Sequence, residues 1–239
     1  MRAICTIARR ELGSMFRLPV GWIVLALFLL LTGTVFSLRL IPGSPASLRD
    51  FFQVSAWLLM PVAPAISMRL FSEELRTGTA EMLLTAPVSN TGIVLGKYLG
   101  ALGFLVCMLV PTLVFPAVLW TISDPRPDLG PIAAGYLSLI LQGALYLAIG
   151  SAISAMTTSQ TLAYLATLFP ILGLLLLGSV STETVPLWLA KTIHAIAIGP
   201  RTADFARGII DTAHVVFFLA SSSVFLFLAH AALDARRWR

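Results

Sequence analysis

The residues best suited to chemistry in this sequence form one polar segment between two apolar stretches. The segment runs from Arg69 to Pro87, and it holds the densest group of charges in the chain: Glu73, Glu74, Arg76 and Glu81. Acidic side chains can meet the cations of a partner protein, and the nearby Leu83 and Leu84 can fill an apolar cleft. The segment therefore predicts a short helix over residues 72–86 that acts as a docking surface. A solvated loop that only connects two helices is the competing interpretation.

Motifs for catalysis and nucleotide binding are missing from the sequence. It contains no Gly-x-Ser-x-Gly and no His-Glu-x-x-His, and its three histidines are dispersed. The stretch Gly92–Tyr98 has the Gly-Lys pair of a phosphate-binding loop, but one residue too few separates its glycines. Tyr98 also stands where a metal-binding Ser or Thr is needed. We expect no catalytic, cofactor or metal site in this chain, which leaves an intramembrane enzyme as a disfavoured alternative.

Three glycines at the start of the same stretch suit close packing of helices. Gly92, Gly96 and Gly100 recur every four residues. This spacing places three positions without side chains on one helix face, where another helix can approach closely.

The elements that position these residues must lie in a membrane. Hydrophobic residues make up 58% of the chain and charged residues 11%, whereas a soluble domain carries about 25% charged residues. A water-exposed globule of this length could not hide so much apolar surface. The basic residues form no stripe with aromatic residues, so nucleic acid is not an expected partner. The composition predicts an all-α integral membrane protein embedded in the lipid bilayer.

Six apolar runs are long enough to cross a bilayer, which takes about 20 residues of helix. They are Val20–Leu38, Gln53–Met68, Ile93–Ile122, Pro131–Met156, Thr161–Val180 and Ala213–Leu233. A weaker stretch, Val185–Gly199, is short for a full crossing, and we expect a partly inserted or interfacial segment there.

Residues 2–17, ahead of the first run, predict an amphipathic helix on the inner membrane surface. Glu11 falls in the middle of its apolar face. This indicates fraying of the helix, a local ion pair, or a contact with a cation of a partner. With six crossings both termini share one side, and placing them inside puts ten of the 16 Lys and Arg residues there. We therefore expect both termini in the cytoplasm.

Several stretches along the chain together carry a resemblance to one known family of membrane proteins. The main one is the run from Phe71 to Ser89, Phe-Ser-Glu-Glu-Leu-Arg-Thr-Gly-Thr-Ala-Glu-Met-Leu-Leu-Thr-Ala-Pro-Val-Ser, followed by Ile93-Val-Leu-Gly-Lys-Tyr-Leu-Gly. Supporting stretches are Ala8-Arg-Arg-Glu-Leu with Pro19-Val-Gly-Trp, Ala148-Ile-Gly with Ser154 and Ser159-Gln160, and Phe205-Ala-Arg-Gly-Ile-Ile-Asp211. Together these stretches resemble the permeases of ABC exporters of the second type. Within these permeases the chain is most similar to the branch of the gliding-motility permease and the copper-maturation permease of nitrous oxide reductase.

The resemblance implies one permease domain over residues 1–239 in the cytoplasmic membrane. A separate ABC ATPase subunit would bind the ATP and Mg, two permease copies, alike or different, would form a dimer, and an auxiliary extracytoplasmic subunit could join them. Short reentrant or surface helices would occupy residues 181–211. The residues expected to dock on the ATPase are Glu11, Glu73, Glu74, Arg76, Gly78, Thr79, Glu81 and Leu84. The substrate is not determined, and a membrane assembly factor without transport activity is the other function that stays open.

The last expectation concerns the outer segment before the final run. Asp204, Arg207 and Asp211 are spaced three and four residues apart. A helix through them would stack the three side chains on one face, where they would pair and stabilise a short outer helix.

Overall fold

The computed structural model describes residues 2–40, 47–79, 89–123, 126–178, 186, 188, 192 and 195–237. Within these ranges every regular element is a helix, and six helical segments are long and apolar enough to cross a membrane. They are α2 (Pro19–Arg39), α3 (Arg49–Ser67), α6 continued by η1 and α7 (Asn90–Leu109, Val110–Leu113 and Val114–Ile122), α8 (Leu129–Met156), α9 (Gln160–Leu177) and α12 (Thr212–Arg237). The prediction of an all-α membrane protein with six spans is confirmed.

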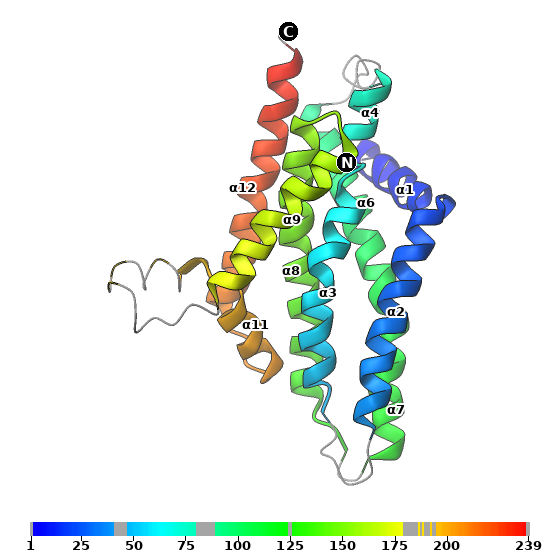
Figure 1. Cartoon of the computed structure of the whole chain (residues 1–239), viewed down its shortest axis with the longest axis vertical. Coiled ribbons are helices and arrows are strands. Elements are labelled where there is room, and N and C mark those ends of the chain that lie inside the picture. Colours follow the sequence, from blue (N-terminus) through cyan, green and yellow to red (C-terminus); the bar gives the residue numbers. More distant parts are fainter. Residues whose placement is uncertain are drawn as a thin grey trace.

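Three shorter helices accompany the spans: α1 (Arg2–Arg17), α4 (Ser72–Thr77) and α11 (Gly199–Ala206). Helix α1 lies obliquely across one end of the bundle, and α4 and the carboxyl end of α12 lie at that same end (Figure 1). Both chain ends are therefore on one side of the bundle, as an even number of crossings requires. We call this the α1/α4 end.

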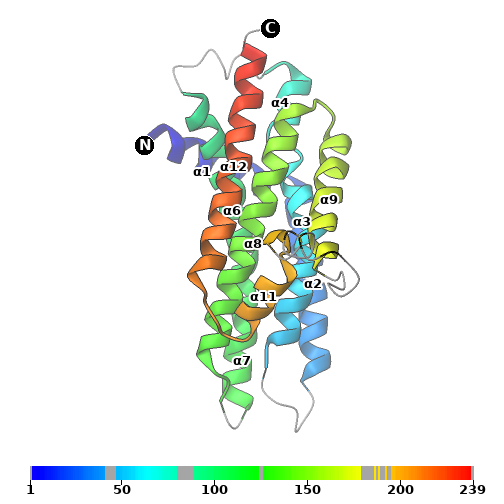
Figure 2. The ribbon, with the colours of Figure 1, turned by 90° about the vertical axis from the view of Figure 1, so that its left-hand side faces the viewer.

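Helix α8 is the central element, and most of its surface is buried by its neighbours (Figures 1 and 2). Three of its glycines allow this because they leave room for side chains of other helices. A Cβ atom built on Gly135 would lie 2.4 Å from the Phe52 ring. One built on Gly143 would lie 2.3 Å from Leu105, and one built on Gly150 would lie 1.9 Å from the Ser67 hydroxyl. Small residues let membrane helices approach closely, which is how α3 and α6 pack on α8.

The third span is interrupted by Pro111, which has no N–H group to continue the α-helical ladder. The chain there forms the short 3-10 helix η1. Polar side chains compensate: the Thr112 hydroxyl donates to the Leu109 carbonyl at 2.6 Å, and the Tyr136 hydroxyl donates to the Thr112 carbonyl at 2.9 Å. Such replacement partners are what allow a helix to break inside a membrane.

Helix α11 lies beside the lower half of α8 rather than beyond the end of the bundle (Figures 1 and 2). It packs against α8 and α3. The expected short helices over 181–211 are thus represented by α11, while residues 179–185, 187, 189–191 and 193–194 lie outside the described residues.

Candidate functional site

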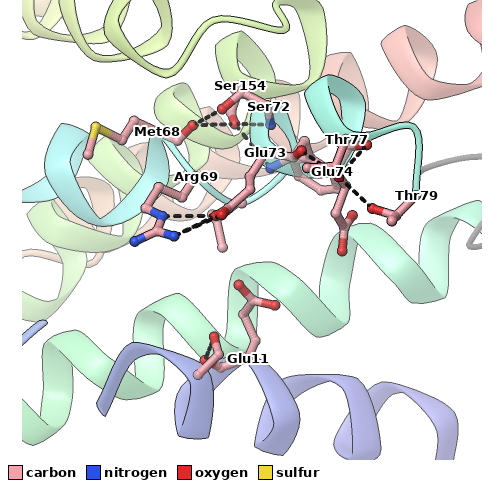
Figure 3. A network of polar contacts seen from close by, with 12 residues as sticks. Glu11, Met68, Arg69, Ser72, Glu73, Glu74, Thr77, Thr79 and Ser154 are labelled. Carbon is pink, nitrogen blue, oxygen red and sulfur yellow. Dashed lines mark hydrogen bonds and ion pairs between the residues drawn. The ribbon is translucent and has the colours of Figure 1, made fainter. Parts of the chain in front are cut away.

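The start of α4 is attached to the centre of the bundle through one serine of α8. The Ser154 hydroxyl accepts hydrogen bonds from the backbone N–H groups of Phe71 and Ser72, both at 3.1 Å, and donates to the Met68 carbonyl at 3.0 Å (Figure 3). The first N–H groups of a helix have no partner within the helix. Ser154 supplies that partner from a buried position, so α4 is held against α8 at its first turn.

Helix α4 is shorter than the helix predicted over residues 72–86. The helix ends at Thr77, and Gly78 follows in the left-handed conformation with φ of 73°. A left-handed glycine is a common way for a helix to end, because it lacks the Cβ that disfavours this geometry. A continuous helix through Gly78 is therefore wrong. Residues 80–88, which include Glu81 and Leu84, lie outside the described residues, and their docking role stays a prediction.

A buried lysine connects three elements at the α1/α4 end. Lys97 of α6 has a side chain that is only 2% exposed. Its Nζ lies 2.9 Å from Glu74 Oε1 of α4 and 3.6 Å from Glu11 Oε2 of α1, and it donates to the Leu70 carbonyl at 2.5 Å. Removing an ammonium group from water costs several kcal/mol unless other groups replace the water. Here those groups come from α1, α4 and the turn before α4.

Helix α1 reaches Lys97 because two glycines of α6 let it come close. A Cβ at Gly96 would lie 2.8 Å from Ile7 Cβ, and a Cβ at Gly100 would lie 2.7 Å from Glu11 Cβ. These two glycines of the predicted packing face therefore lie against α1. The third, Gly92, instead donates its N–H to the Ser89 hydroxyl at 3.2 Å at the start of α6.

The position of Glu11 explains why an acid interrupts the apolar face of α1. Its side chain is 14% exposed and pairs with Lys97 of α6, so its cation comes from a distant helix of the same chain. A role for Glu11 in docking on the ATPase stays a prediction, and little of this side chain is available for it.

The two adjacent acids of α4 are also engaged within the chain. Glu73 accepts hydrogen bonds from Arg69 at 2.7, 2.9 and 3.0 Å (Figure 3), and Glu74 pairs with Lys97 and lies 3.8 Å from Arg10. By contrast, the residues from Arg76 to Thr79 are exposed. Within the described part of the chain, the predicted docking residues thus divide into acids that attach α4 to the bundle and three residues, Arg76, Gly78 and Thr79, of an exposed tip over residues 76–79.

A cavity of about 420 Å³ opens beside this ion-pair network, between α1 and α4. Arg10, Arg17 and Arg69 line it together with Glu73 and Glu74. Charges of both signs at the mouth of a cleft suit a polar segment of another protein.

Comparison with known protein families shows which family the chain belongs to. The profile of the ABC-2 family transporter proteins matches residues 5–233. The chain belongs to this family. It is a permease subunit of an ABC transporter, and permeases of this family pair with an ABC ATPase subunit. A search among curated proteins found no significant match.

In this ABC-2 permease, sequence reasoning missed three residues that build the site: Arg69, Lys97 and Ser154. Lys97 carried a usable signal, because a lysine within an apolar run needs a partner. The residue type of Ser154 does not by itself reveal its role, because many serines in membrane helices bond only to the backbone of their own helix. Ser151 does so, donating to the Leu147 carbonyl.

The outer segment of the permease differs from the expected helix through Asp204, Arg207 and Asp211. Helix α11 ends at Ala206, and Gly208 follows with φ of 85°. Asp211 lies beyond this end and accepts a hydrogen bond from the Ala213 N–H at 2.8 Å, where α12 begins. Arg207 does pair with Asp204, at 3.8 Å, but its side chain is 59% exposed. The stack of three residues on one helix face is therefore wrong.

A different polar cluster joins α11 to α12. Arg201 Nη1 lies 3.3 Å from His214 Nδ1, and His214 Nε2 lies 3.1 Å from Asp204 Oδ2. Because arginine only donates, Nδ1 accepts and Nε2 carries the proton that is donated to Asp204. The guanidinium also lies 3.9 Å from the centre of the Phe217 ring. Burial lowers the pKa of the Arg201 guanidinium, and the nearby Asp211 carboxylate partly opposes this.

Proposed function

We propose that this permease transmits ATP hydrolysis by its ATPase to export across the membrane, or to mechanical work, through α4. The observation that carries the proposal is the way in which α4 is held. Its first turn is bonded to α8 through Ser154, its middle is bonded to α6 and α1 through Lys97, and its tip is exposed.

This attachment suits a coupling element. A force applied at the tip would move a rigid helix of six residues, roughly 9 Å long. Because one end is bonded to α8 and the middle to α6 and α1, the displacement would reach three helices at once. Alternating access needs such correlated motion of packed helices.

The remaining features of the proposal follow from the sequence. The biased distribution of Lys and Arg supports cytoplasmic termini and insertion in the cytoplasmic membrane. Reporter fusions at Arg239 and near Pro45 should then report opposite sides. ATP and Mg would bind to the partner ATPase, and two permease copies would form the working unit. The matching stretches around Phe71–Ser89 support the gliding-motility and nitrous-oxide-reductase-maturation branch.

The test must distinguish a loss of ATPase docking from a disruption of the ion pairs inside the permease. Reversing Glu73 and Glu74 would break the pairs with Arg69 and Lys97, so a loss of ATPase binding could come from a loosened bundle. Arg76→Glu avoids this problem because its side chain lies at the exposed tip. Arg126→Glu is the matched control, with the same charge change at an exposed position shortly before α8 begins at Leu129. The start of α8 lies at the end of the bundle away from α4 (Figure 1).

We expect Arg76→Glu to insert normally but to lose co-purification of the ATPase or stimulation of its ATP hydrolysis, because rim charges act on association. Arg126→Glu should behave as the native protein. Normal capture and stimulation by Arg76→Glu would remove the tip from the docking surface. An ATPase that binds but hydrolyses ATP at the same rate with and without this subunit would favour the assembly-factor alternative.

A further inference from the structure

The start of α6 is bonded to the carboxyl end of α12. Asn90, the first residue of α6, is 8% exposed, and its side-chain amide donates to Asp234 Oδ1 of α12. A polar side chain at the start of a helix often caps the N–H groups of that same helix. That role is already filled, since the Ser89 hydroxyl accepts from the Gly92 N–H. The Asn90 side chain therefore serves a contact between two helices.

The carboxylate of Asp234 is oriented by a histidine of its own helix. His230 lies one turn earlier on α12, and its Nε2 lies 3.0 Å from Asp234 Oδ2. Because a carboxylate only accepts, Nε2 carries the proton of this hydrogen bond. One oxygen of Asp234 is thus bonded to His230, and the other faces the Asn90 amide. A group that is held by a neighbour in this way keeps its direction.

The surroundings of Asp234 suit an attachment point. The first turn of a helix carries a partial positive charge, so a carboxylate beside the start of α6 is favourable. The carboxyl end of α12 is itself bonded to α8, because Arg236 Nη2 donates to the Met156 carbonyl at 2.8 Å. The start of α6 is therefore attached to a helix end that the bundle holds in place.

The segment that connects α4 to α6 is consequently attached at both of its ends. At the first end, Ser154 of α8 accepts from the N–H groups of Phe71 and Ser72. At the other end, Asn90 is bonded to Asp234 of α12. The two attachments lie on different spans, so a displacement of the exposed tip of α4 would act on both α8 and α12.

We propose that Asp234 is a positioning residue for the coupling of ATP hydrolysis to the spans. It holds the start of α6 on α12, so that movement of the segment between α4 and α6 reaches α12 as well as α8. This inference rests on the proposed function of α4. The role requires a hydrogen-bond acceptor at this position, which the Asn90 amide can reach.

The first measurement is the rate of ATP hydrolysis by the complex of the full-length permease with its ATPase. We expect Asp234→Ala to capture the ATPase normally but to lower the stimulated kcat about threefold, because water competes for a partly exposed hydrogen bond and leaves it a modest net effect. The KM for ATP should stay unchanged, because the nucleotide binds to the partner. Asn90→Ala should give the same defect.

Conservative and matched variants separate positioning from a general loss of stability. Asp234→Asn keeps an acceptor for the Asn90 amide and should restore kcat. Asp128→Ala removes an aspartate that accepts from the Gly130 N–H at the start of α8, and it should leave kcat unchanged. The double variant of Asn90→Ala with Asp234→Ala should be no worse than either single change. A native kcat in Asp234→Ala, no rescue by Asp234→Asn, or an equal loss in Asp128→Ala would overturn the proposal.

The second measurement uses the permease without the ATPase. Spin labels at the exposed positions Thr91 and Ala235, with Cys5 and Cys107 replaced by alanine, report the distance between the start of α6 and the end of α12. We expect a narrow distribution of distances that Asp234→Ala broadens and Asp234→Asn restores. An unchanged distribution in Asp234→Ala would refute the positioning of α6. A native permease that does not stimulate its ATPase would instead refute the proposed function, and with it the coupling role of Asp234.

Discussion

Replacing Lys97 with methionine should release α1 and α4 from α6. The lysine is 2% exposed and has two carboxylates and one carbonyl within 3.6 Å. Methionine fills a similar volume but leaves Glu11 and Glu74 without their shared cation. Removing one partner of a buried ion pair costs about 3–5 kcal/mol.

The cost at this site should be at the low end of that range or below it. Glu11 and Glu74 are 14% and 22% exposed, so water can partly replace the ammonium group. We expect a loss of about 2–3 kcal/mol in the free energy of unfolding. Glu74→Gln should cost less, about 1–2 kcal/mol, because its amide oxygen still accepts from Lys97.

Unfolding of the purified permease by titration with a denaturing detergent measures these differences. A double-mutant cycle between Lys97→Met and Glu74→Gln should show a coupling energy of about 1–2 kcal/mol, as expected for residues in direct contact. Arg76→Met is the control, a cation removed from an exposed position, and should change stability by less than about 0.5 kcal/mol. If Lys97→Met costs no more than Arg76→Met, or the cycle gives no coupling, the buried network does not hold these helices together.

Three further changes probe the contacts that place α4, α1 and α11. Ser154→Ala leaves two buried N–H groups at the start of α4 without an acceptor and should lower the free energy of unfolding by about 1–3 kcal/mol, with weaker stimulation of the ATPase. Gly100→Ala places a Cβ 2.7 Å from Glu11 Cβ, so it should displace α1 and speed proteolysis at the amino terminus. Arg201→Ala removes the hydrogen bond to His214 and the contact with the Phe217 ring, and should destabilise the permease more than Arg207→Ala in the same unfolding measurement.

Each of these three changes has a matched comparison. Ser151→Ala removes a buried hydroxyl that bonds only within α8 and should cost less than Ser154→Ala. The Cβ added by Gly103→Ala would lie 3.7 Å from its nearest neighbour, Leu12, which is an ordinary contact distance. This change should therefore leave α1 in place. Equal effects of Ser154→Ala and Ser151→Ala, or of Gly100→Ala and Gly103→Ala, would show that these contacts do not position the helices. Likewise, an Arg207→Ala variant as unstable as Arg201→Ala would contradict the cluster at His214.

Two errors in reading the sequence had one physical cause. The helix predicted over 72–86 and the helical stack from Asp204 to Asp211 each pass through a glycine that the structure uses in the left-handed conformation, Gly78 and Gly208. A glycine inside a helix costs only about 1 kcal/mol in propensity. The local sequence therefore could not decide whether each glycine continued its helix or ended it.

The sequence alone determined the six spans and the amphipathic helix α1, because insertion of a helix into lipid depends on the apolar character of about 20 consecutive residues. The structure decided which charges meet. Lys97 is paired with Glu11 and Glu74 and bonded to the Leu70 carbonyl, groups that lie far from it along the chain and come together only when α1, α4 and α6 pack. The same holds for Ser154 at the start of α4 and for His214 between Arg201 and Asp204. A buried polar group must find its partners in three dimensions, and the spacing of residues along one helix does not reveal which partners those are.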